Sequence, residues 1–173
     1  MAKVIIGICG RQGSGKTTLS KMLGYPIVPF AEPIKEALME MGCPFHLLYD
    51  PEFKEKPSDF FLGKTPRFAM QTLGTEWGRN LIGQNFWLER WKEAVANTRT
   101  VVVDDVRFPQ EVELLRDLGA TLVGIKRHRT TVENWLHESE TLDLEKLGIS
   151  TIENNGTPKE LLEAFRAATN RGT

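Results

Sequence analysis

Short apolar segments alternate with helical patterns along this chain of 173 residues. The first segment, Val4–Cys9, is β-branched and apolar on both faces, as a buried parallel strand is. Similar strand patterns follow at 27–30, 100–103, 120–126 and 149–152. Because parallel strands need long crossover connections, usually helices, this alternation predicts an α/β fold with a five-stranded parallel sheet. We expect helices on both faces of the sheet, which makes a three-layer sandwich.

The helical patterns carry start and stop signals. Residues 16–23 form a pattern that ends at Gly24, a residue type common just after helices. A second pattern, at 34–41, follows Pro33, which suits a first helical turn. Between 42 and 64, prolines and aromatic residues predict an irregular or short-helix insertion. The last helices are expected at 110–118 and 158–168.

The middle of the chain predicts two adjacent helices. One begins at Pro66, with Thr65 as its cap, and runs to about residue 82. The next is capped by Asn85 and carries apolar residues four positions apart, a stripe that should face the core: Trp87, Trp91 and Val95.

Composition excludes several classes of protein. Lys and Arg total 22 and Asp and Glu total 23, so the formal net charge is −1 and binding to a nucleic acid polymer is not favoured. Cys9 and Cys43 form no Cys-x-x-Cys pair and no cluster with histidine, which argues against a disulfide framework and a zinc site. The first apolar run is too short to span a membrane. We expect one reduced domain over residues 1–173, located in the cytoplasm.

The clearest chemical signal is a phosphate-loop motif. Residues 10–17 read Gly-Arg-Gln-Gly-Ser-Gly-Lys-Thr, match G-x-x-x-x-G-K-[ST], and lie between a predicted strand and a predicted helix. Glycines let backbone N–H groups turn toward phosphate oxygens, and the helix N-terminus adds partial positive charge. We expect Lys16 to reach the β- and γ-phosphates of ATP and the Thr17 hydroxyl to ligate Mg²⁺. The expected ATP-binding residues are Arg11, Gly13, Ser14, Gly15, Lys16, Thr17 and Thr18.

An acidic element follows the strand pattern at 100–103. Asp104 and Asp105 stand at its carboxyl end, the edge of an α/β sheet where ligands bind. Strand alternation would let only one of them face Mg²⁺. We assign Asp104 to the metal and Asp105 to a substrate or an arginine; a helix cap or a surface acid is the alternative.

The helix predicted at 66–82 offers cations and small residues on one side. At 100° per residue, four residues fall within about 60° and predict a smooth strip for a ligand: Arg67, Gln71, Gly74 and Gly78. Arg79 lies roughly 120° around but could converge on a phosphate from the helix end. Four further residues form an apolar arc expected to face the core: Met70, Leu73, Trp77 and Leu81. The alternative for the glycines is close helix packing.

A polar stretch follows the strand pattern at 120–126. It contains Arg127 and Arg129, and in small kinases this is where a mobile lid closes over ATP. The two arginines would neutralise the phosphoryl group in transfer. A solvated basic loop is the alternative.

The chain resembles deoxynucleoside monophosphate kinases of the bacteriophage type, within the adenylate-kinase-like P-loop group. Five stretches carry the resemblance: Gly10–Thr18, FAEPIK at 30–35, QTLGTEWGR at 71–79, DDVRF at 104–108 and HESE at 137–140. The segment 43–64 lies outside these stretches, and base selection is expected there. His137, Ser139 and Glu140 either contact a ligand or order the base of the lid.

The resemblance implies a P-loop kinase that phosphorylates deoxynucleoside 5′-monophosphates to diphosphates with MgATP. It places acceptor binding in residues 31–98 and the lid in 127–140. With Gly74 from the strip above, the acceptor-binding set is Lys35, Arg67, Gln71, Gly74, Arg79, Asp105 and Arg107. The catalytic set is Lys16, Arg127 and Arg129. Partners beyond the two nucleotides are not implied, and a homodimer is left open.

Two other functions compete with this interpretation. One is a kinase for another phosphorylated metabolite such as phosphomevalonate, because related kinases share the Asp-x-Arg and His-x-Ser-Glu features. The other is a nucleotide-dependent binding or switch protein. The several arginines outside the phosphate loop disfavour the switch, because two phosphate ligands that repel each other need cations between them.

Overall fold

The computed structural model describes residues 3–127 and 142–169. The chain divides into two compact units, one formed by residues 1–29 with 97–173 and the other by residues 30–96. The region expected to bind the acceptor, 31–98, has nearly the bounds of the second unit.

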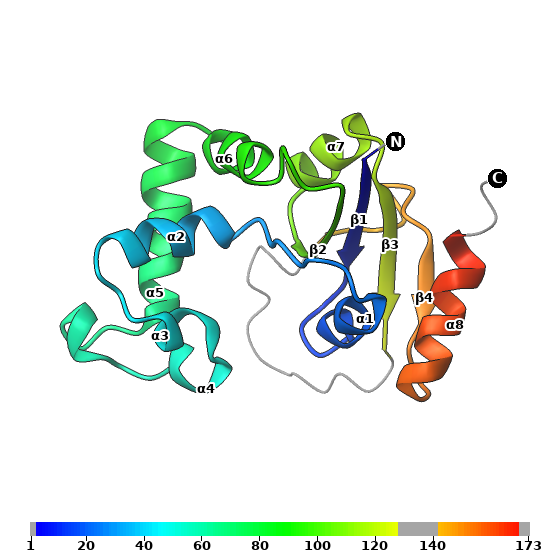
Figure 1. Ribbon diagram of the computed structural model, residues 1–173, viewed down its shortest axis with the longest axis horizontal. Coiled ribbons are helices and arrows are strands. Elements are labelled where there is room, and N and C mark those ends of the chain that lie inside the picture. The colour runs from blue at the N-terminus through cyan, green and yellow to red at the C-terminus, as the bar shows by residue number, and fades with distance from the viewer. Residues whose placement is uncertain (1–2, 128–141, 170–173) are drawn as a thin grey trace. The chain divides into compact units, whose positions relative to one another are not determined.

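The first unit contains a parallel sheet (Figure 1). Its four strands lie in the order β2-β1-β3-β4. All neighbouring strands are parallel, with Ile6 of β1 paired to Val102 of β2 and to Thr121 of β3. The strands are β1 (Val4–Cys9), β2 (Thr100–Val106), β3 (Thr121–Lys126) and β4 (Thr151–Glu153).

The prediction of a fifth strand at 27–30 is wrong. In the described residues Ile27 makes a single parallel bridge to Val102, next to β2 and outside any strand. The Val28 N–H and the Pro26 carbonyl bond to Val102, but Pro26 has no N–H with which to extend the ladder backward. In the forward direction the chain turns at Phe30 into a helix. One bridge therefore replaces the expected strand.

Helices cover both faces of this sheet (Figure 1). On one face, Leu19 of α1 (Lys16–Leu23) and Phe165 of α8 (Pro158–Thr169) pack in one buried cluster with residues of all four strands. On the other face, the Leu115 side chain of α7 (Pro109–Asp117) closely approaches Gly7 of β1. The expected layers of helix, sheet and helix are present around four strands.

The second unit is helical. Its first helix, α2 (Glu32–Glu40), packs through Leu38 against the segment expected to be irregular or to form short helices. That segment contains three short helices: α3 (Phe45–Tyr49), α4 (Pro51–Lys54) and η1 (Asp59–Phe61). In the described part of the chain, no helix has the length and apolar character needed to cross a membrane.

The helix predicted at 66–82 changes its pitch. Thr65 caps α5 (Pro66–Gln71), as expected, by accepting a hydrogen bond from the Phe68 N–H at 3.1 Å. The chain then continues as a π-helix, η2 (Thr72–Ile82). A π-helix bonds each residue to the fifth one along, so its turn is wider than 3.6 residues. The angular positions expected beyond Gln71 therefore do not hold.

This change in pitch overturns the predicted faces of η2. Trp77 and Leu81, expected in the core, are 41% and 76% exposed, whereas Gly74 and Gly78 are buried. The indole N–H of Trp87 donates to the Gly74 carbonyl at 3.0 Å. Trp87 packs on Gly78 and Ile34 lies close to Gly74, as the close-packing alternative expects; the ligand contact at Gly74 stays a prediction.

Helix α6 (Phe86–Ala94) confirms the predicted stripe. Trp87 and Trp91 are 6% and 0% exposed, and Val95, just beyond the helix end, is 1% exposed. Trp91 packs against Phe30, with ring centroids 4.7 Å apart. Residues four apart on one helix face therefore supply much of the core of this unit.

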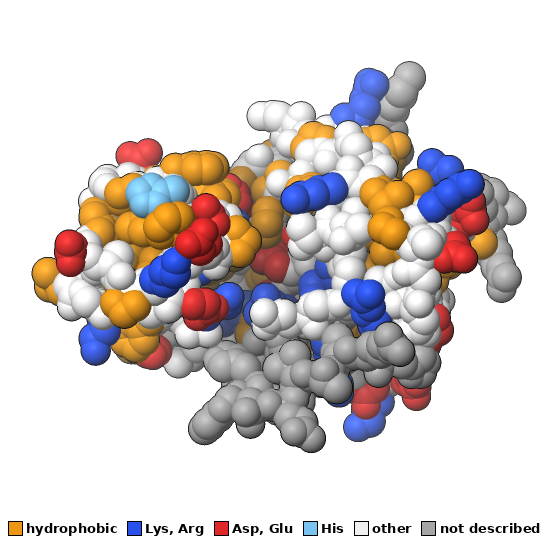
Figure 2. Space-filling view, turned by 90° about the horizontal axis from the view of Figure 1, so that it is seen from below, with side chains coloured by type: hydrophobic (Ala, Val, Ile, Leu, Met, Phe, Trp, Pro, Cys, Tyr) orange, Lys and Arg blue, Asp and Glu red, His pale blue; other side chains and the backbone are white. Residues whose placement is uncertain are grey.

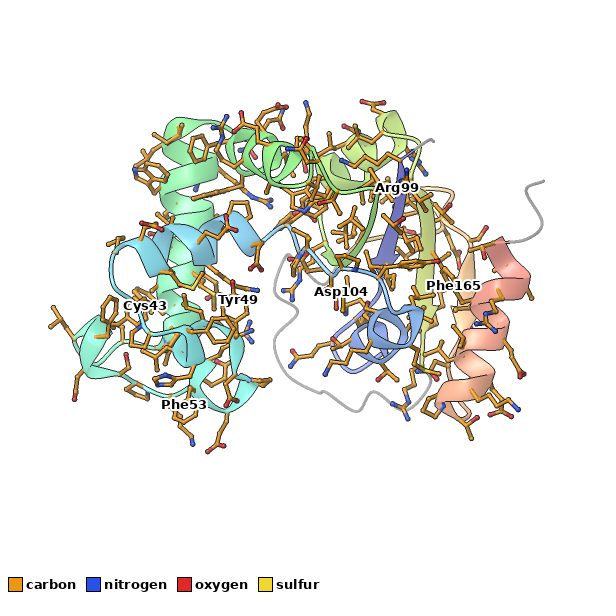
Figure 3. The ribbon with its side chains drawn as sticks, viewed as in Figure 1. Cys43, Tyr49, Phe53, Arg99, Asp104 and Phe165 are labelled. Atoms are coloured by element: carbon orange, nitrogen blue, oxygen red, sulfur yellow. The ribbon has the colours of Figure 1, made fainter. Side chains whose placement is uncertain are left out.

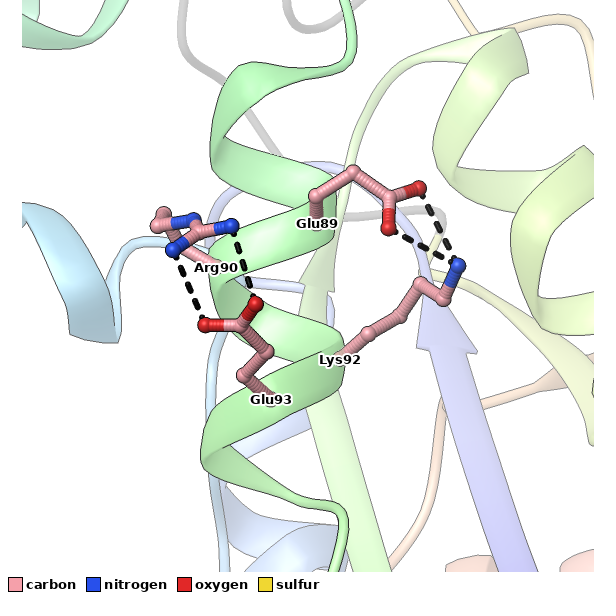
Figure 4. Close-up of polar contacts among 4 residues, drawn as sticks. All are labelled: Glu89, Arg90, Lys92 and Glu93. Atoms are coloured by element: carbon pink, nitrogen blue, oxygen red, sulfur yellow. Dashed lines mark hydrogen bonds and ion pairs between the residues drawn. The ribbon is translucent and has the colours of Figure 1, made fainter.

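The exposed face of α6 carries two ion pairs. Arg90 pairs with Glu93 at 2.9 Å, and Lys92 pairs with Glu89 at 2.9 Å (Figure 4). All four side chains are between 39% and 66% exposed, so each pair contributes little to stability.

Apolar side chains are also exposed on the second unit. Figure 2 shows a face on which hydrophobic side chains gather around a histidine. Phe45, Phe60, Leu62 and Phe68 are between 40% and 93% exposed. The insertion between α2 and α5 is thus less completely packed than the sheet of the first unit.

Candidate functional site

The phosphate-loop motif folds as a loop between β1 and α1. Gly13 and Gly15 have φ angles of +77° and +108°, which side chains rarely permit. Lys16 folds back over the loop, and its Nζ donates to the carbonyl oxygens of Gly10 at 2.6 Å and Arg11 at 2.9 Å. The ammonium group is thus held directly above the backbone that is expected to surround phosphate.

The N-terminus of α1 offers donors without a competing carboxylate. Gly15 caps this fully described helix without a side-chain hydrogen bond, and the first turn holds no acidic residue. Such an end attracts anions through its N–H groups and its partial positive charge. Arg11, Thr17 and Thr18 are exposed at the same end. The loop therefore has the electrostatics of an anion site.

Ser14 is the buried member of the loop. It is 1% exposed, and its hydroxyl has no hydrogen-bond partner within the described residues. A buried polar atom of this kind calls for a water or a ligand atom. The hydroxyl is thus a donor suited to a phosphate oxygen.

Asn154 supports the loop from a distant part of the sequence and belongs to none of the motifs predicted above. Its side-chain N–H donates to the Ser14 carbonyl at 2.7 Å, and the residue is 7% exposed. The Asn-Asn-Gly run after the last strand could not single out Asn154, since such a run also predicts an ordinary turn.

Asp104 and Asp105 lie inside β2, which continues to Val106 and does not end before them. Between the partners of Gly7 and Cys9, β2 has two residues where β1 has one, so β2 is bulged here. A bulge interrupts the alternation of side chains, and both carboxyl groups are half-buried. The sheet register brings them to the edge where β1 enters the phosphate loop, as the label of Asp104 shows (Figure 3). Alternation no longer decides which one faces a metal.

The turn after β2 fixes the backbone of Arg107. Glu111, in the first turn of α7, is 2% exposed, and its carboxylate accepts from the N–H groups of Arg107 at 2.7 Å and Phe108 at 3.1 Å. These bonds hold the backbone from which the exposed Arg107 side chain projects. Sequence reasoning missed Glu111, although a Glu three residues after a helix cap is a known signal.

In the second unit, Lys35 belongs to a polar cluster. Its side chain is 10% exposed; its Nζ pairs with Glu32 at 3.1 Å and lies 4.4 Å from the ring centroid of Tyr49. The Tyr49 hydroxyl donates to the other Glu32 oxygen. Burial, together with this carboxylate, raises the pKa of the Tyr49 phenol, so it remains a donor at neutral pH. Figure 3 labels Tyr49 within this unit.

Three further predicted acceptor contacts lie on α5 and η2. Arg67 pairs with Glu55, and both side chains are more than one-third exposed. Gln71 is exposed and Arg79 is half-buried. Because an exposed ion pair is weak, the Arg67 guanidinium can exchange Glu55 for an anionic ligand at small cost.

The predicted lid falls mostly outside the described residues. Arg127 follows β3 and is exposed. Arg129 lies outside the described residues, as do His137, Ser139 and Glu140. Their expected roles stay predictions.

Oxygen donors at the sheet edge fit the expected Mg²⁺. Within residues 3–127 and 142–169, no group of three or more His, Cys, Asp or Glu side chains could hold a metal. Mg²⁺ needs few protein ligands, because it keeps waters and binds substrate phosphates. Thr17 supplies a hydroxyl on the exposed start of α1, and Asp104 supplies a carboxylate at the same edge. This donor set suits a magnesium ion completed by phosphate oxygens.

Both cysteines are expected to be inert in the folded protein. Cys9 and Cys43 are buried; burial, with the Glu111 carboxylate adding to it, raises the pKa of the Cys9 thiol to about 12, and burial raises that of Cys43. Because the thiolate is the reactive form, we expect no reaction with an aromatic disulfide reagent at pH 8. Protein unfolded in urea, the control, should release two thiol equivalents per chain. Native thiols that react as fast as free cysteine would contradict this packing.

Comparisons with known proteins point in one direction. A family model described as deoxynucleotide monophosphate kinase matches residues 65–164. A protein of Acanthamoeba polyphaga mimivirus, provisionally named a deoxynucleotide monophosphate kinase, is 32% identical over 181 residues, with 87% of this chain and 91% of that protein covered. The deoxynucleoside-5′-monophosphate kinase of Escherichia phage T5 is 42% identical over 68 residues, which cover 35% of this chain and 27% of the phage protein.

A solved structure shares the fold. TT1252 from Thermus thermophilus superposes with a TM-score of 0.56 and 18% identity, and the match covers 100% of both chains. At that identity the likeness concerns the fold alone.

Proposed function

Because this chain belongs to the deoxynucleotide monophosphate kinase family, we propose that it transfers the γ-phosphoryl group of ATP to a deoxynucleoside 5′-monophosphate. The observation that carries the donor half of this proposal is the loop at residues 10–17, where Lys16 lies over two backbone carbonyls at the start of a helix without an acidic first turn. The fold is then a P-loop kinase with residues 127–140 as its lid.

The transfer proceeds in line, with no strong general base. The phosphate of a nucleoside monophosphate is largely ionised at pH 7, since the second pKa of such monoesters is about 6. Its oxygen attacks the γ-phosphorus, and the chain contributes positioning and charge neutralisation. Lys16, Arg127 and Arg129 act on the transferring group.

Cations and polar groups would hold the acceptor. The residues expected to do so are Lys35, Arg67, Gln71, Arg79, Asp105 and Arg107. Arg67 would exchange its ion pair with Glu55 for the acceptor phosphate.

Mg²⁺ would be held by Thr17 and Asp104 together with the phosphates, where it reduces the negative charge that repels the attacking oxygen. Thr17 lies in the first turn of α1. A cytoplasmic location and a homodimer stay predictions.

An acceptor panel tests the function. The protein is incubated with MgATP and, in turn, with each common deoxynucleoside and ribonucleoside monophosphate, and ADP release is followed. We expect ADP release to require a deoxynucleoside monophosphate. The panel also reports which bases are accepted and how strictly ribose is rejected.

The same panel separates the competing functions. ADP release with phosphomevalonate but with no nucleotide acceptor would replace this proposal by a metabolite kinase. Tight ATP binding with slow hydrolysis that no acceptor accelerates would replace it by a switch protein.

A further inference from the structure

The phosphate loop is anchored by a side chain that no sequence motif includes. Asn154 follows β4 directly, and its side-chain amide reaches the loop across 140 positions of sequence to bond the Ser14 carbonyl at 2.7 Å. Its own backbone N–H donates to the Lys126 carbonyl at the end of β3, at 2.8 Å. Asn154 thus connects the loop to the carboxyl ends of two strands.

The bond to Ser14 orients one peptide unit of the loop. In a trans peptide the C=O and the N–H point in opposite directions. Fixing the Ser14 carbonyl toward Asn154 therefore turns the Gly15 N–H away from Asn154. We propose that Asn154 is a positioning residue that presents the Gly15 N–H to ATP phosphate oxygens; this inference rests on the proposed function.

The packing around Gly15 supports the same role. A Cβ built at Gly15 would overlap the Asn154 amide nitrogen, so glycine and asparagine are matched at this contact. Asn154 is 7% exposed, and the hydrogen bond from its side-chain amide to the Ser14 carbonyl is buried. A buried carbonyl that loses its donor costs free energy, so the loop would rearrange if Asn154 were removed.

The test compares nucleotide binding with turnover. N154D keeps the size of the side chain but replaces the donor N–H with an oxygen that repels the Ser14 carbonyl. N154A removes the contact without adding charge and keeps the assay available should N154D fold poorly. N155D is the control, because it places the same charge one residue along at an exposed position.

MgATP binding is measured by calorimetry without acceptor, and steady-state constants are measured with the best acceptor of the panel. We expect N154D and N154A to bind MgATP about tenfold more weakly and to raise the KM for ATP similarly, since a lost buried bond of about 1.4 kcal/mol corresponds to tenfold. The KM for the acceptor should change less than twofold. N155D should resemble the wild type.

Two results would overturn the inference. If both Asn154 variants melt at lower temperature yet bind MgATP as the wild type does, Asn154 is only a structural contact. If the KM values for both substrates rise equally, the effect is not on the phosphate loop. A wild type that binds MgATP but phosphorylates no nucleotide refutes the proposed function instead, and the calorimetric comparison still decides the role of Asn154.

Discussion

Replacing Lys16 with alanine is expected to lower kcat for phosphoryl transfer by a factor of about 10²–10³, the usual loss when a preorganised group that stabilises transition-state charge is removed. In the present structure the Lys16 ammonium lies over the loop, bonded to the carbonyls of Gly10 and Arg11. With ATP bound, the same group would meet the β- and γ-phosphates. Alanine removes the charge where negative charge must be stabilised, and the helix α1 tolerates it well.

The matched control is Lys21→Ala, in the last turn of the same helix. This exposed lysine is a full turn or more from the loop, so its loss should leave kcat within about twofold. Thermal melting of both variants should stay within a few degrees of the wild type. Normal turnover by Lys16→Ala would show that the loop does not hold the donor phosphates.

Replacing Gly78 with alanine is expected to destabilise the second unit by about 2 kcal/mol. A methyl group at Gly78 would overlap the Trp87 indole, with Cδ1 and Cε2 of that ring both at 2.7 Å. Trp87 cannot retreat easily, because its N–H is bonded to the Gly74 carbonyl. Alanine ordinarily favours a helix over glycine by up to about 1 kcal/mol, so a net loss would be a clear sign of close packing. Urea denaturation measures the change.

Gly74→Ala gives the graded comparison on the same helix. A methyl group there would lie 2.9 Å from Cδ1 of Ile34, the flexible end of a side chain that can shift. We expect the free energy of unfolding of Gly74→Ala to differ from that of the wild type by no more than about 1 kcal/mol. A Gly78→Ala protein more stable than the wild type would contradict the packing of Trp87 on η2.

The parts of the fold that depend on local sequence were predicted well. The position of the phosphate loop could be predicted from residues 10–17, because the backbone angles of its glycines and the contact of Lys16 with Gly10 are local. The stripe of Trp87, Trp91 and Val95 follows from a regular α-helix. The family resemblance, carried by short motifs along nearly the whole chain, is confirmed by the family model and the mimivirus relative.

The errors in the fold share a cause, namely backbone geometry that the spacing of apolar residues does not contain. The wheel for residues 66–82 assumed 3.6 residues per turn, and the switch to a π-helix at Thr72 moved Trp77 and Leu81 out of the core. The expected strand at 27–30 stops after one bridge to Val102, because the chain turns at Phe30 into α2. A period read from sequence contains neither effect.

Supporting residues were missed for the same reason. Asn154 reaches Ser14 from across the chain, and Tyr49 reaches Glu32 from another helix. Neither belongs to a spacing pattern. Glu111 could have been predicted as a capping residue of the helix, but its hydrogen bond from the Arg107 N–H is seen only in the folded turn.

The destination of the γ-phosphoryl group tests the central claim most directly. ATP labelled with ³²P at the γ-position is mixed with excess enzyme and the preferred deoxynucleoside monophosphate for a single turnover, and the products are separated. Direct transfer predicts that the label appears in the deoxynucleoside diphosphate, with one labelled molecule for each ADP formed. Label that appears as inorganic phosphate, with no labelled diphosphate, would contradict the account.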